Sequence, residues 1–210
     1  MKIKSILCLI GLWLSISCQA QTGRLFTVDN ELSSSMVNSI FQDKNGIIWI
    51  ATEDGLNKYD GAKFTVYKHD KENKHSLLNN YVRFLFEDSK GHCYVGTLSG
   101  LQIYDSGTDQ FTDIPLIQTN GEIAPTNVAY MMERKNGEIL IGTAGLGVLK
   151  IVETNGKLEA RQLDDFILSN IVNLLHEDKR GNLWVSTGDK GLFCITPNKK
   201  NKTSSLNSIQ

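Results

Sequence analysis

The histidines and cysteines are the side chains best suited to bind a transition metal, and their spacing decides whether they could do so. His92 and Cys93 are adjacent, His69 and His75 stand six residues apart in a polar stretch, and His176 stands alone. None of these arrangements supplies ligands at the spacing of a zinc site, so we interpret these residues as loop or packing residues. We therefore expect no metal site.

Two polar segments resemble parts of other functional sites. Residues 43–46 (DKNG) begin like a calcium-binding loop but lack the later acidic positions and the closing Glu, which favours a hairpin turn. Residues 33–35 (SSS) lack a nucleophile elbow or a paired base, which favours a loop between strands. The sequence thus predicts no catalytic residue, no cofactor and no enzymatic activity within this chain.

Binding of a small ligand is the chemistry that the remaining polar residues favour. Recognition of a sugar needs planar polar groups beside an aromatic ring, and Arg83 with Tyr81 is the most suitable pair. Asp54 and Asp189 are further candidates on the same kind of loop. The alternative interpretation is that all four are ordinary exposed loop residues.

Four repeats of about 45 residues must position these side chains. Each repeat is anchored on a glycine, and successive anchors are separated by 45, 46 and 44 residues: Gly46, Gly91, Gly137 and Gly181. Six residues after each glycine stands a threonine: Thr52, Thr97, Thr143 and Thr187. Three residues after it stands a large apolar or aromatic residue: Trp49, Tyr94, Leu140 and Trp184. Nine residues before each glycine stands a valine: Val37, Val82, Val128 and Val172.

Each repeat is predicted to form short antiparallel strands. First strands are expected at residues 37–42, 82–87, 128–133 and 172–177, each followed by a hairpin turn in which the glycine takes a positive φ. Second strands follow at 47–52 and its equivalents, and third strands at 56–59, 101–104, 148–151 and 192–195. A fourth strand is expected at 63–67, with weaker counterparts at 110–114 and 158–162 and none that is clear in the last repeat.

Four strands recurring at this period predict an all-β fold made of β-propeller blades. Leucine-rich repeats are shorter, and helical repeats need a 3.6-residue apolar period that these segments lack. In a propeller the first strand lines the central channel, and the second-to-third-strand turns meet the inter-blade loops on one rim. Tyr81, Asp54 and Asp189 belong to that rim. Arg83 occupies the variable position after the repeated valine, which is filled elsewhere by Asn38, Ala129 and Asn173.

Residues 39–52 (SIFQDKNGIIWIAT) and 54–59 (DGLNKY) resemble the two-component regulator propeller repeat. The resemblance is strong in the first and fourth copies, good in the second and degenerate in the third, and it covers residues 25–196. It implies the periplasmic sensor of Bacteroidetes hybrid two-component systems, with two propellers, an immunoglobulin-like domain, a membrane helix in the inner membrane, a histidine kinase, and receiver and DNA-binding modules. Such sensors commonly detect polysaccharide fragments. No kinase is encoded in this chain.

The first twenty residues are predicted to be a signal peptide rather than part of the fold. Lys2 and Lys4 precede an apolar stretch at residues 6–16, which is too short to span a bilayer comfortably. Cleavage after Ala20 is the favoured interpretation, and the alternatives are lipid attachment at Cys18 and retention as an anchor. The mature protein is thus expected in the periplasm.

Composition agrees with a soluble globular protein, because 40% of the 210 residues are hydrophobic and 21% are charged. The formal net charge of -1 gives no support to a nucleic-acid partner. Outside the predicted signal only Cys93 and Cys194 remain, in blades that are not neighbours. We therefore expect two buried free thiols and no disulfide.

The repeats divide the chain as follows: signal peptide 1–20, outer closing strand and lead-in 21–36, blades at 37–80, 81–126 and 127–170, a partial fourth blade at 171–200, and a linker to a missing next blade at 201–210. Residues 26–28 resemble 64–66, a fourth strand that precedes any first strand. The tail, residues 206–210, resembles residues 32–36, which precede the first blade. We expect an incomplete ring and the N-terminal part of a longer sensor; the alternative is a complete four-bladed ring.

Three classes of function follow. The leading one is a sensor portion of a hybrid two-component receptor that binds an oligosaccharide and depends on further blades and a kinase in its parent protein. The second is an exported scaffold for protein interaction or homodimerisation. The third, a propeller lyase or hydrolase, is disfavoured because no acid and base converge.

Overall fold

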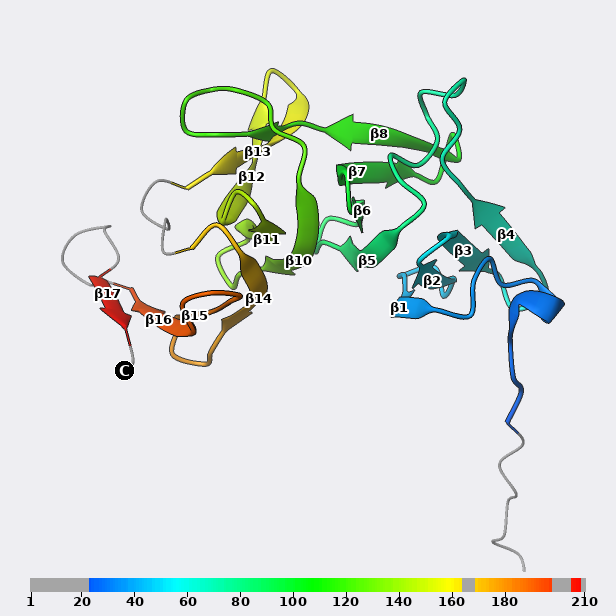
Figure 1. Cartoon of the computed structure of the whole chain (residues 1–210), viewed down its shortest axis with the longest axis horizontal. Helices are drawn as coiled ribbons and strands as arrows, with labels where there is room; N and C mark the ends of the chain where they lie inside the picture. Colours follow the sequence, from blue (N-terminus) through cyan, green and yellow to red (C-terminus); the bar gives the residue numbers. More distant parts are fainter. Residues whose placement is uncertain (1–22, 164–168, 198–204, 209–210) are drawn as a thin grey trace, which may run out of the picture.

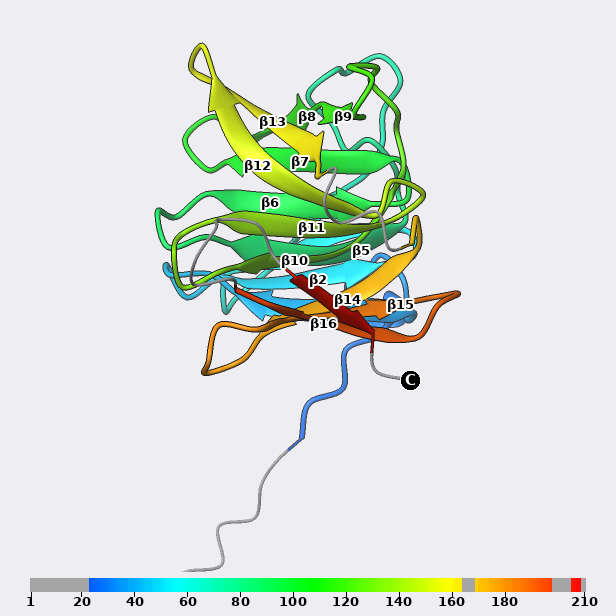
Figure 2. The same ribbon diagram turned by 90° about the vertical axis from the view of Figure 1, so that its left-hand side faces the viewer.

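The computed structural model describes residues 23–163, 169–197 and 205–208. Four β-sheets follow one another in an arc, and each consists mainly of one sequence repeat (Figures 1 and 2). The prediction of four-stranded antiparallel propeller blades is therefore confirmed. The predicted signal peptide, with Cys18 and Ala20, lies outside the described residues. No helix in the described ranges is long and apolar enough to cross a membrane.

The strand bounds agree with the repeat pattern to within a few residues. Blade 1 contains β1 (Val37–Gln42), β2 (Ile48–Thr52), β3 (Gly55–Tyr59) and β4 (Phe64–Tyr67). Blade 2 contains β5 (Val82–Glu87), β6 (Cys93–Thr97), β7 (Gly100–Asp105) and β8 (Gln110–Ile114). Blade 3 contains β10 (Asn127–Glu133), β11 (Ile139–Ala144), β12 (Val148–Thr154) and β13 (Lys157–Gln162). Blade 4 contains β14 (Val172–Glu177), β15 (Leu183–Thr187), β16 (Leu192–Thr196) and β17 (Ser205–Ser208).

Two outer strands differ from the prediction. The last repeat has a fourth strand, because β17 pairs antiparallel with β16. The linker that we expected over 201–210 is therefore wrong for residues 205–208. The polar composition of β17 hides it in the sequence, and the free edge of β16 supplies its hydrogen bonds. In addition, the two-residue strand β9 (Leu116–Ile117) leaves blade 2 and pairs in parallel with β13 of blade 3.

The outer closing strand expected within residues 21–36 is not a strand in the described part of that segment. A short 3-10 helix, η1 (Val28–Asn30), stands there instead, and the amide of Leu32 donates a hydrogen bond to the carbonyl of Thr27. The Phe26 ring packs 5.3 Å from Phe64 and 5.7 Å from Tyr59, centroid to centroid.

The repeated turn residues close the two hairpins of each blade. The four anchoring glycines have φ between 82° and 88°, a region that side chains disfavour. Asp43 accepts hydrogen bonds from the amides of Asn45 and Ile47 and from the indole nitrogen of Trp49. The second turn is held by the repeated threonine, as the Thr52 hydroxyl donates to the carbonyl of Gly55 at 2.8 Å. These contacts explain why the residue types recur.

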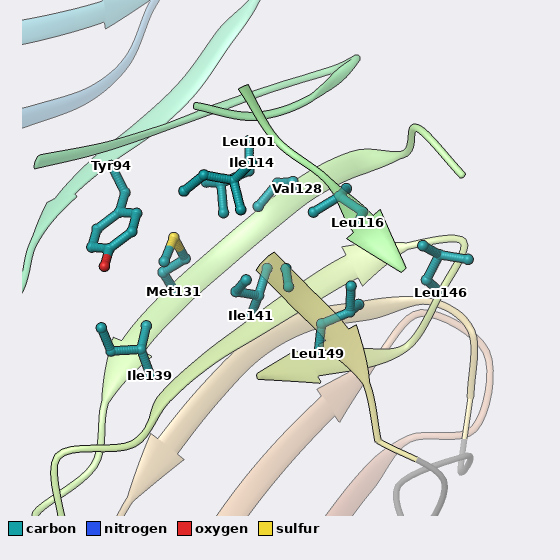
Figure 3. Close-up of a cluster of buried hydrophobic side chains, with 11 residues drawn as sticks. Tyr94, Leu101, Ile114, Leu116, Val128, Met131, Ile139, Ile141, Leu146 and Leu149 are labelled. Atoms are coloured by element: carbon teal, nitrogen blue, oxygen red, sulfur yellow. The ribbon is translucent and has the colours of Figure 1, made fainter. Parts of the chain in front are cut away.

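The hydrophobic core consists of three layers, each between neighbouring blades. Figure 3 shows the layer between blades 2 and 3, where Tyr94 and Leu101 face Val128, Met131 and Ile141. Similar clusters lie between blades 1 and 2 and between blades 3 and 4. The arc does not close, since blades 1 and 4 lie at its opposite ends (Figure 1). The open ring agrees with the expected incomplete propeller.

The two cysteines differ in burial. Cys93 is buried, which together with the nearby Glu87 and Asp43 carboxylates raises the pKa of its thiol to about 12. The expectation of two buried thiols is wrong for Cys194, which is partly exposed. Cys194 lies opposite Trp184 in blade 4, and no further described blade covers this end of the arc.

This difference predicts selective alkylation. Iodoacetamide at pH 8 is expected to modify Cys194 of the folded protein much faster than Cys93, because the thiolate is the nucleophile and must be accessible. Peptide mass spectrometry after timed quenching measures both rates. In urea the two thiols should react alike, and equal rates in the folded protein would contradict the prediction.

Candidate ligand-binding rim

The loops that could bind a ligand lie together on one side of the arc, which we call the turn rim: the second-to-third-strand turns and the inter-blade loops. Each turn is fastened to a loop by backbone hydrogen bonds. The amide of Gly55 donates to the carbonyl of Asn80 at 2.7 Å, and the amide of Gly145 donates to the carbonyl of Asn170 at 2.7 Å. The rim is thus a hydrogen-bonded surface that spans successive blades.

The part of the rim between blades 1 and 2 brings two predicted residues into one polar patch. The Asp54 carboxylate forms an ion pair with Lys68 at 2.6 Å and accepts a hydrogen bond from the Asn80 side chain at 3.1 Å. The Tyr81 hydroxyl donates to the Glu53 carboxylate, the residue adjacent to Asp54, at 3.1 Å. This patch offers carboxylates, an amide, an ammonium group and a partly exposed phenol.

Arg83 lies on a β-bulge. The pairing of β5 with β6 shifts by one residue between Val82 and Phe84, so Arg83 is the extra residue. The same shift recurs in every blade at the variable position, namely at Asn38, Ala129 and Asn173. Bulges redirect side chains and are frequent beside functional sites. The residue at this position varies visibly between the repeats, but the bulge itself depends on strand pairing and leaves no signal in the sequence.

The Arg83 side chain is half-buried, and no hydrogen bond or ion pair joins its guanidinium group to another described residue. A guanidinium group presents a rigid fork of donors that suits carboxylates and paired hydroxyl groups. Arg83 is therefore a free hydrogen-bond donor on the channel strand of blade 2.

Asp189 lies in a different part of the rim. It belongs to the β15–β16 turn of blade 4, where its carboxylate accepts a hydrogen bond from the hydroxyl of Ser169. Tyr81 and Asp54 lie between blades 1 and 2, so the structure does not bring Asp189 into their patch. Of the four predicted residues, Tyr81 and Asp54 share one surface, Arg83 lies on the adjoining inner strand, and Asp189 is separate.

A second polar cluster, which sequence reasoning missed, joins the outer strands of blades 1 and 2. Lys58 donates to the Tyr104 hydroxyl at 2.8 Å, and its ammonium lies 5.5 Å from the centroid of the Trp49 ring. Asp109 accepts hydrogen bonds from Tyr104 and Tyr67, which hold the pKa of its carboxyl below the usual range. These groups satisfy one another, so the cluster fastens two blades rather than forming an open site.

A groove of about 480 Å³ lies between the outer edges of blades 2 and 3, away from the turn rim. Its lining mixes apolar residues with charged ones: Ile103, Thr112, Asp113, Ile114, Pro115, Gly156, Lys157, Leu158 and Glu159. No group of three metal-binding side chains occurs within the described ranges. The groove is a second candidate binding surface, although its lining brings few polar groups together.

Known sequences match parts of this chain. The two-component regulator propeller family matches residues 31–54 and 167–189, in the regions of the first and fourth blades. Histidine kinase P4 of Formosa agariphila is 42% identical over 69 residues, which make up 31% of this chain and 5% of that protein. The chain therefore spans a small part of this relative.

Solved structures show the same fold at low sequence identity. The extracellular domain of a hybrid two-component system from B. thetaiotaomicron superposes with a TM-score of 0.67 and 22% identity, over 81% of this chain and 25% of that chain. PorZ, a surface component of the type-IX secretion system of Porphyromonas gingivalis, gives a TM-score of 0.61 and 15% identity, over 90% of this chain and 29% of that chain. Both comparisons cover less than a third of the known structure.

Proposed function

We propose that the chain belongs to the sensor region of a hybrid two-component system, because the two-component regulator propeller family matches residues 31–54 and 167–189 and a histidine kinase is similar to part of the chain. The similarity to a histidine kinase and the fold shared with the extracellular domain of a hybrid two-component system support this proposal. In such a system the chain recognises a signal in the periplasm, while phosphoryl transfer belongs to the kinase of the parent protein. No catalytic step is assigned to this chain.

The ligand that we propose is an oligosaccharide bound at the turn rim. The observation that carries this proposal is the arrangement of Tyr81 and Asp54 in one polar patch, with the unpaired guanidinium group of Arg83 on the adjoining inner strand. Sugars present an apolar ring face and dense hydroxyl groups, which aromatic rings and planar polar groups match. Asp189 would contact only a ligand long enough to reach blade 4.

Replacement of Arg83 tests the site. A glycan array of neutral and acidic oligosaccharides identifies the tightest binder, and calorimetry measures its affinity for the full chain. Arg83→Ala is expected to weaken that affinity at least about tenfold, since a hydrogen bond to a charged group contributes roughly 1.5–3 kcal/mol. The free energy of unfolding should change by less than about 0.5 kcal/mol, because no described residue bonds to the guanidinium group.

Arg180→Ala is the matched control, because Arg180 is exposed in the first hairpin turn of blade 4, outside the turn rim. It should leave the affinity unchanged. Equal affinities of Arg83→Ala and the unmodified chain would contradict the site, and absence of binding to every oligosaccharide would contradict the ligand class.

A second candidate function, an exported scaffold for protein interaction, is favoured by one observation. Apolar side chains are exposed at both ends of the arc, where blades 1 and 4 have no neighbouring blade in the described residues. An interaction role and a sensory role use different surfaces and are compatible.

A further inference from the structure

The groove between the outer edges of blades 2 and 3 occupies a place that side chains fill between blades 1 and 2. Strand pairing aligns the two interfaces: Ile103 pairs with Thr112 in blade 2 as Lys58 pairs with Thr65 in blade 1. Blades 2 and 3 both lie inside the arc, and each is described with its four strands. The shape of the groove is therefore set by these two blades and not by the ends of the arc.

The residues at three corresponding positions differ in kind between the two interfaces. The groove has aliphatic side chains there: Ile103, Ile114 and Leu158. The interface between blades 1 and 2 has two charged side chains and a phenol: Lys58, Asp109 and Tyr67. These three bond to one another, since the Asp109 carboxylate accepts from the Tyr67 hydroxyl at 2.6 Å and from Lys58 at 3.5 Å. Aliphatic side chains cannot form such bonds, and a groove of about 480 Å³ remains between blades 2 and 3.

The filled interface shows what kind of group suits this space. The Tyr67 ring lies 5.3 Å from the ring of Phe111 and 6.1 Å from that of Tyr104, centroid to centroid. Blade 3 has smaller residues at the positions of the latter two rings, namely Ile151 and Ala160. The groove thus lacks the aromatic rings that close the neighbouring interface. Its apolar lining suits an aromatic ring supplied by another molecule.

The groove also borders a strand edge that can accept a hydrogen bond. β9 pairs in parallel with β13 (Figure 2), and the amide of Ala160 donates to the carbonyl of Pro115 at 2.9 Å. One step earlier in a parallel ladder, the carbonyl of Leu158 would accept from the amide of Pro115, but proline has no amide hydrogen. The Leu158 carbonyl is therefore available to an added strand, which is a recurring mode of peptide recognition.

The charges beside the groove define the partner further. The Asp113 carboxylate accepts a hydrogen bond from a glutamine of β7 at 2.8 Å, and Glu159 forms an ion pair with Arg161 at 2.7 Å. Lys157 is exposed and forms no ion pair within the described ranges. Neighbouring residues of a strand point to opposite faces, so Lys157 and Leu158 face opposite sides of β13. An added strand with an acidic residue beside Lys157 therefore places its next side chain in the groove.

We propose that this groove binds an extended peptide segment of a partner protein, with an aromatic side chain between blades 2 and 3 and an adjacent acidic residue beside Lys157. The segment adds a strand to β13 through the Leu158 carbonyl. A volume of about 480 Å³ is within the range of binding pockets and accommodates an aromatic side chain with its neighbours. The groove lies away from the turn rim, so this inference is independent of the proposed oligosaccharide.

Fluorescence anisotropy of labelled nine-residue peptides with the full chain tests the proposal. The reference peptide, GSTDYTVSG, has an aspartate followed by a tyrosine and should bind saturably. Serine in place of the tyrosine should weaken binding at least about tenfold, because the buried ring is lost. Lysine in place of the aspartate should weaken it about threefold, as expected for an exposed ion pair. N-acetyltyrosine amide lacks the flanking backbone and should compete at least about tenfold less well than the reference.

Two variants of the chain test the position of the peptide. The double variant Ile103→Lys, Leu158→Asp places in the groove the charged pair that closes the neighbouring interface, and it should weaken binding at least about tenfold. Both side chains are partly exposed, so the β circular-dichroism spectrum should be unchanged. Lys157→Glu should weaken binding of the reference about threefold and strengthen binding of the lysine peptide.

Lys63→Glu is the matched control for the charge, because Lys63 is exposed beside the outer strand of blade 1, away from the groove. It should leave the affinity unchanged, and so should Arg83→Ala, which separates this site from the turn rim. Absence of saturable binding by the reference and by its phenylalanine and tryptophan forms would overturn the proposal. Equal affinities of the tyrosine and serine peptides would also overturn it. Unchanged binding by both groove variants would place the peptide elsewhere and overturn the site.

Discussion

Leu85→Ala is expected to lower the free energy of unfolding by about 3 kcal/mol, whereas Ile40→Ala at the equivalent position of blade 1 should lower it by less than about 0.5 kcal/mol. Leu85 is 6% exposed and packs in the layer between blades 1 and 2, so its truncation leaves a cavity. Ile40 is 68% exposed, so its truncation removes almost no packing.

Equilibrium urea unfolding of each variant and of the unmodified chain measures both changes. Ile40→Ala serves as the control, because Ile40 and Leu85 are aliphatic residues at the same repeat position of a first strand and differ mainly in burial. Two similar losses of stability would mean that the face of blade 1 that carries Ile40 is covered in solution. Two negligible losses would mean that blades 1 and 2 do not pack as described.

Asp88→Ala is expected to lower the free energy of unfolding by about 3 kcal/mol. The carboxylate is 2% exposed and organises the first turn of blade 2. One oxygen accepts from the amides of Lys90 and His92, at 3.0 and 2.8 Å, and the other accepts from the His92 ring and the buried Tyr94 hydroxyl. Removing the carboxylate leaves these donors without their acceptor, and buried unsatisfied groups are costly.

The same carboxylate predicts an acid dependence of stability. Burial raises the pKa of Asp88, but the hydrogen bonds from the His92 amide and ring and from Tyr94 outweigh it, so the pKa is below the usual value. A lowered pKa in the folded state stabilises the protein above the unfolded value of about 3.9, and this contribution is lost as the pH falls through the folded value. Asp88→Ala should therefore lose less stability than the unmodified chain between pH 5 and pH 3, when the urea midpoint is measured at each pH.

Glu72→Ala, which removes an exposed carboxylate, is the control and should follow the unmodified chain at every pH. An Asp88→Ala variant as stable as the unmodified chain at pH 7 would show that water replaces the lost acceptor. An identical acid response of the two proteins would show that Asp88 does not contribute to it.

The architecture could be predicted because its determinants are local. The turn glycines need a positive φ, and Asp43 and Thr52 bond to backbone groups within a few residues of themselves, so each repeat shows its hairpins in its own sequence. The strands between these turns followed from residue types that recur at a fixed spacing. Such signals were weak for β17, whose polar residues form a strand because the edge of β16 is available. They were also weak for β9, which pairs with a strand of the next blade.

The candidate site was only partly predictable. Variation between repeats pointed to Tyr81, Arg83, Asp54 and Asp189, but variation does not say which loops meet. The hydrogen bonds that join Tyr81 to Glu53 and Asp54 to Asn80 connect residues more than twenty positions apart, and the bulge at Arg83 arises from pairing with β6. The Lys58, Tyr104 and Asp109 cluster likewise joins two repeats and has no local pattern.

By itself, the sequence determined that this chain forms four β blades, because backbone conformation in tight turns and short strands depends on neighbouring residues. Only the tertiary structure decided which copies of a repeated position are buried. Ile40 and Leu85 are equivalent in sequence and opposite in exposure, since burial depends on whether another blade covers the face. Burial at a repeated position therefore depends on packing between blades, which the sequence of one repeat cannot reveal.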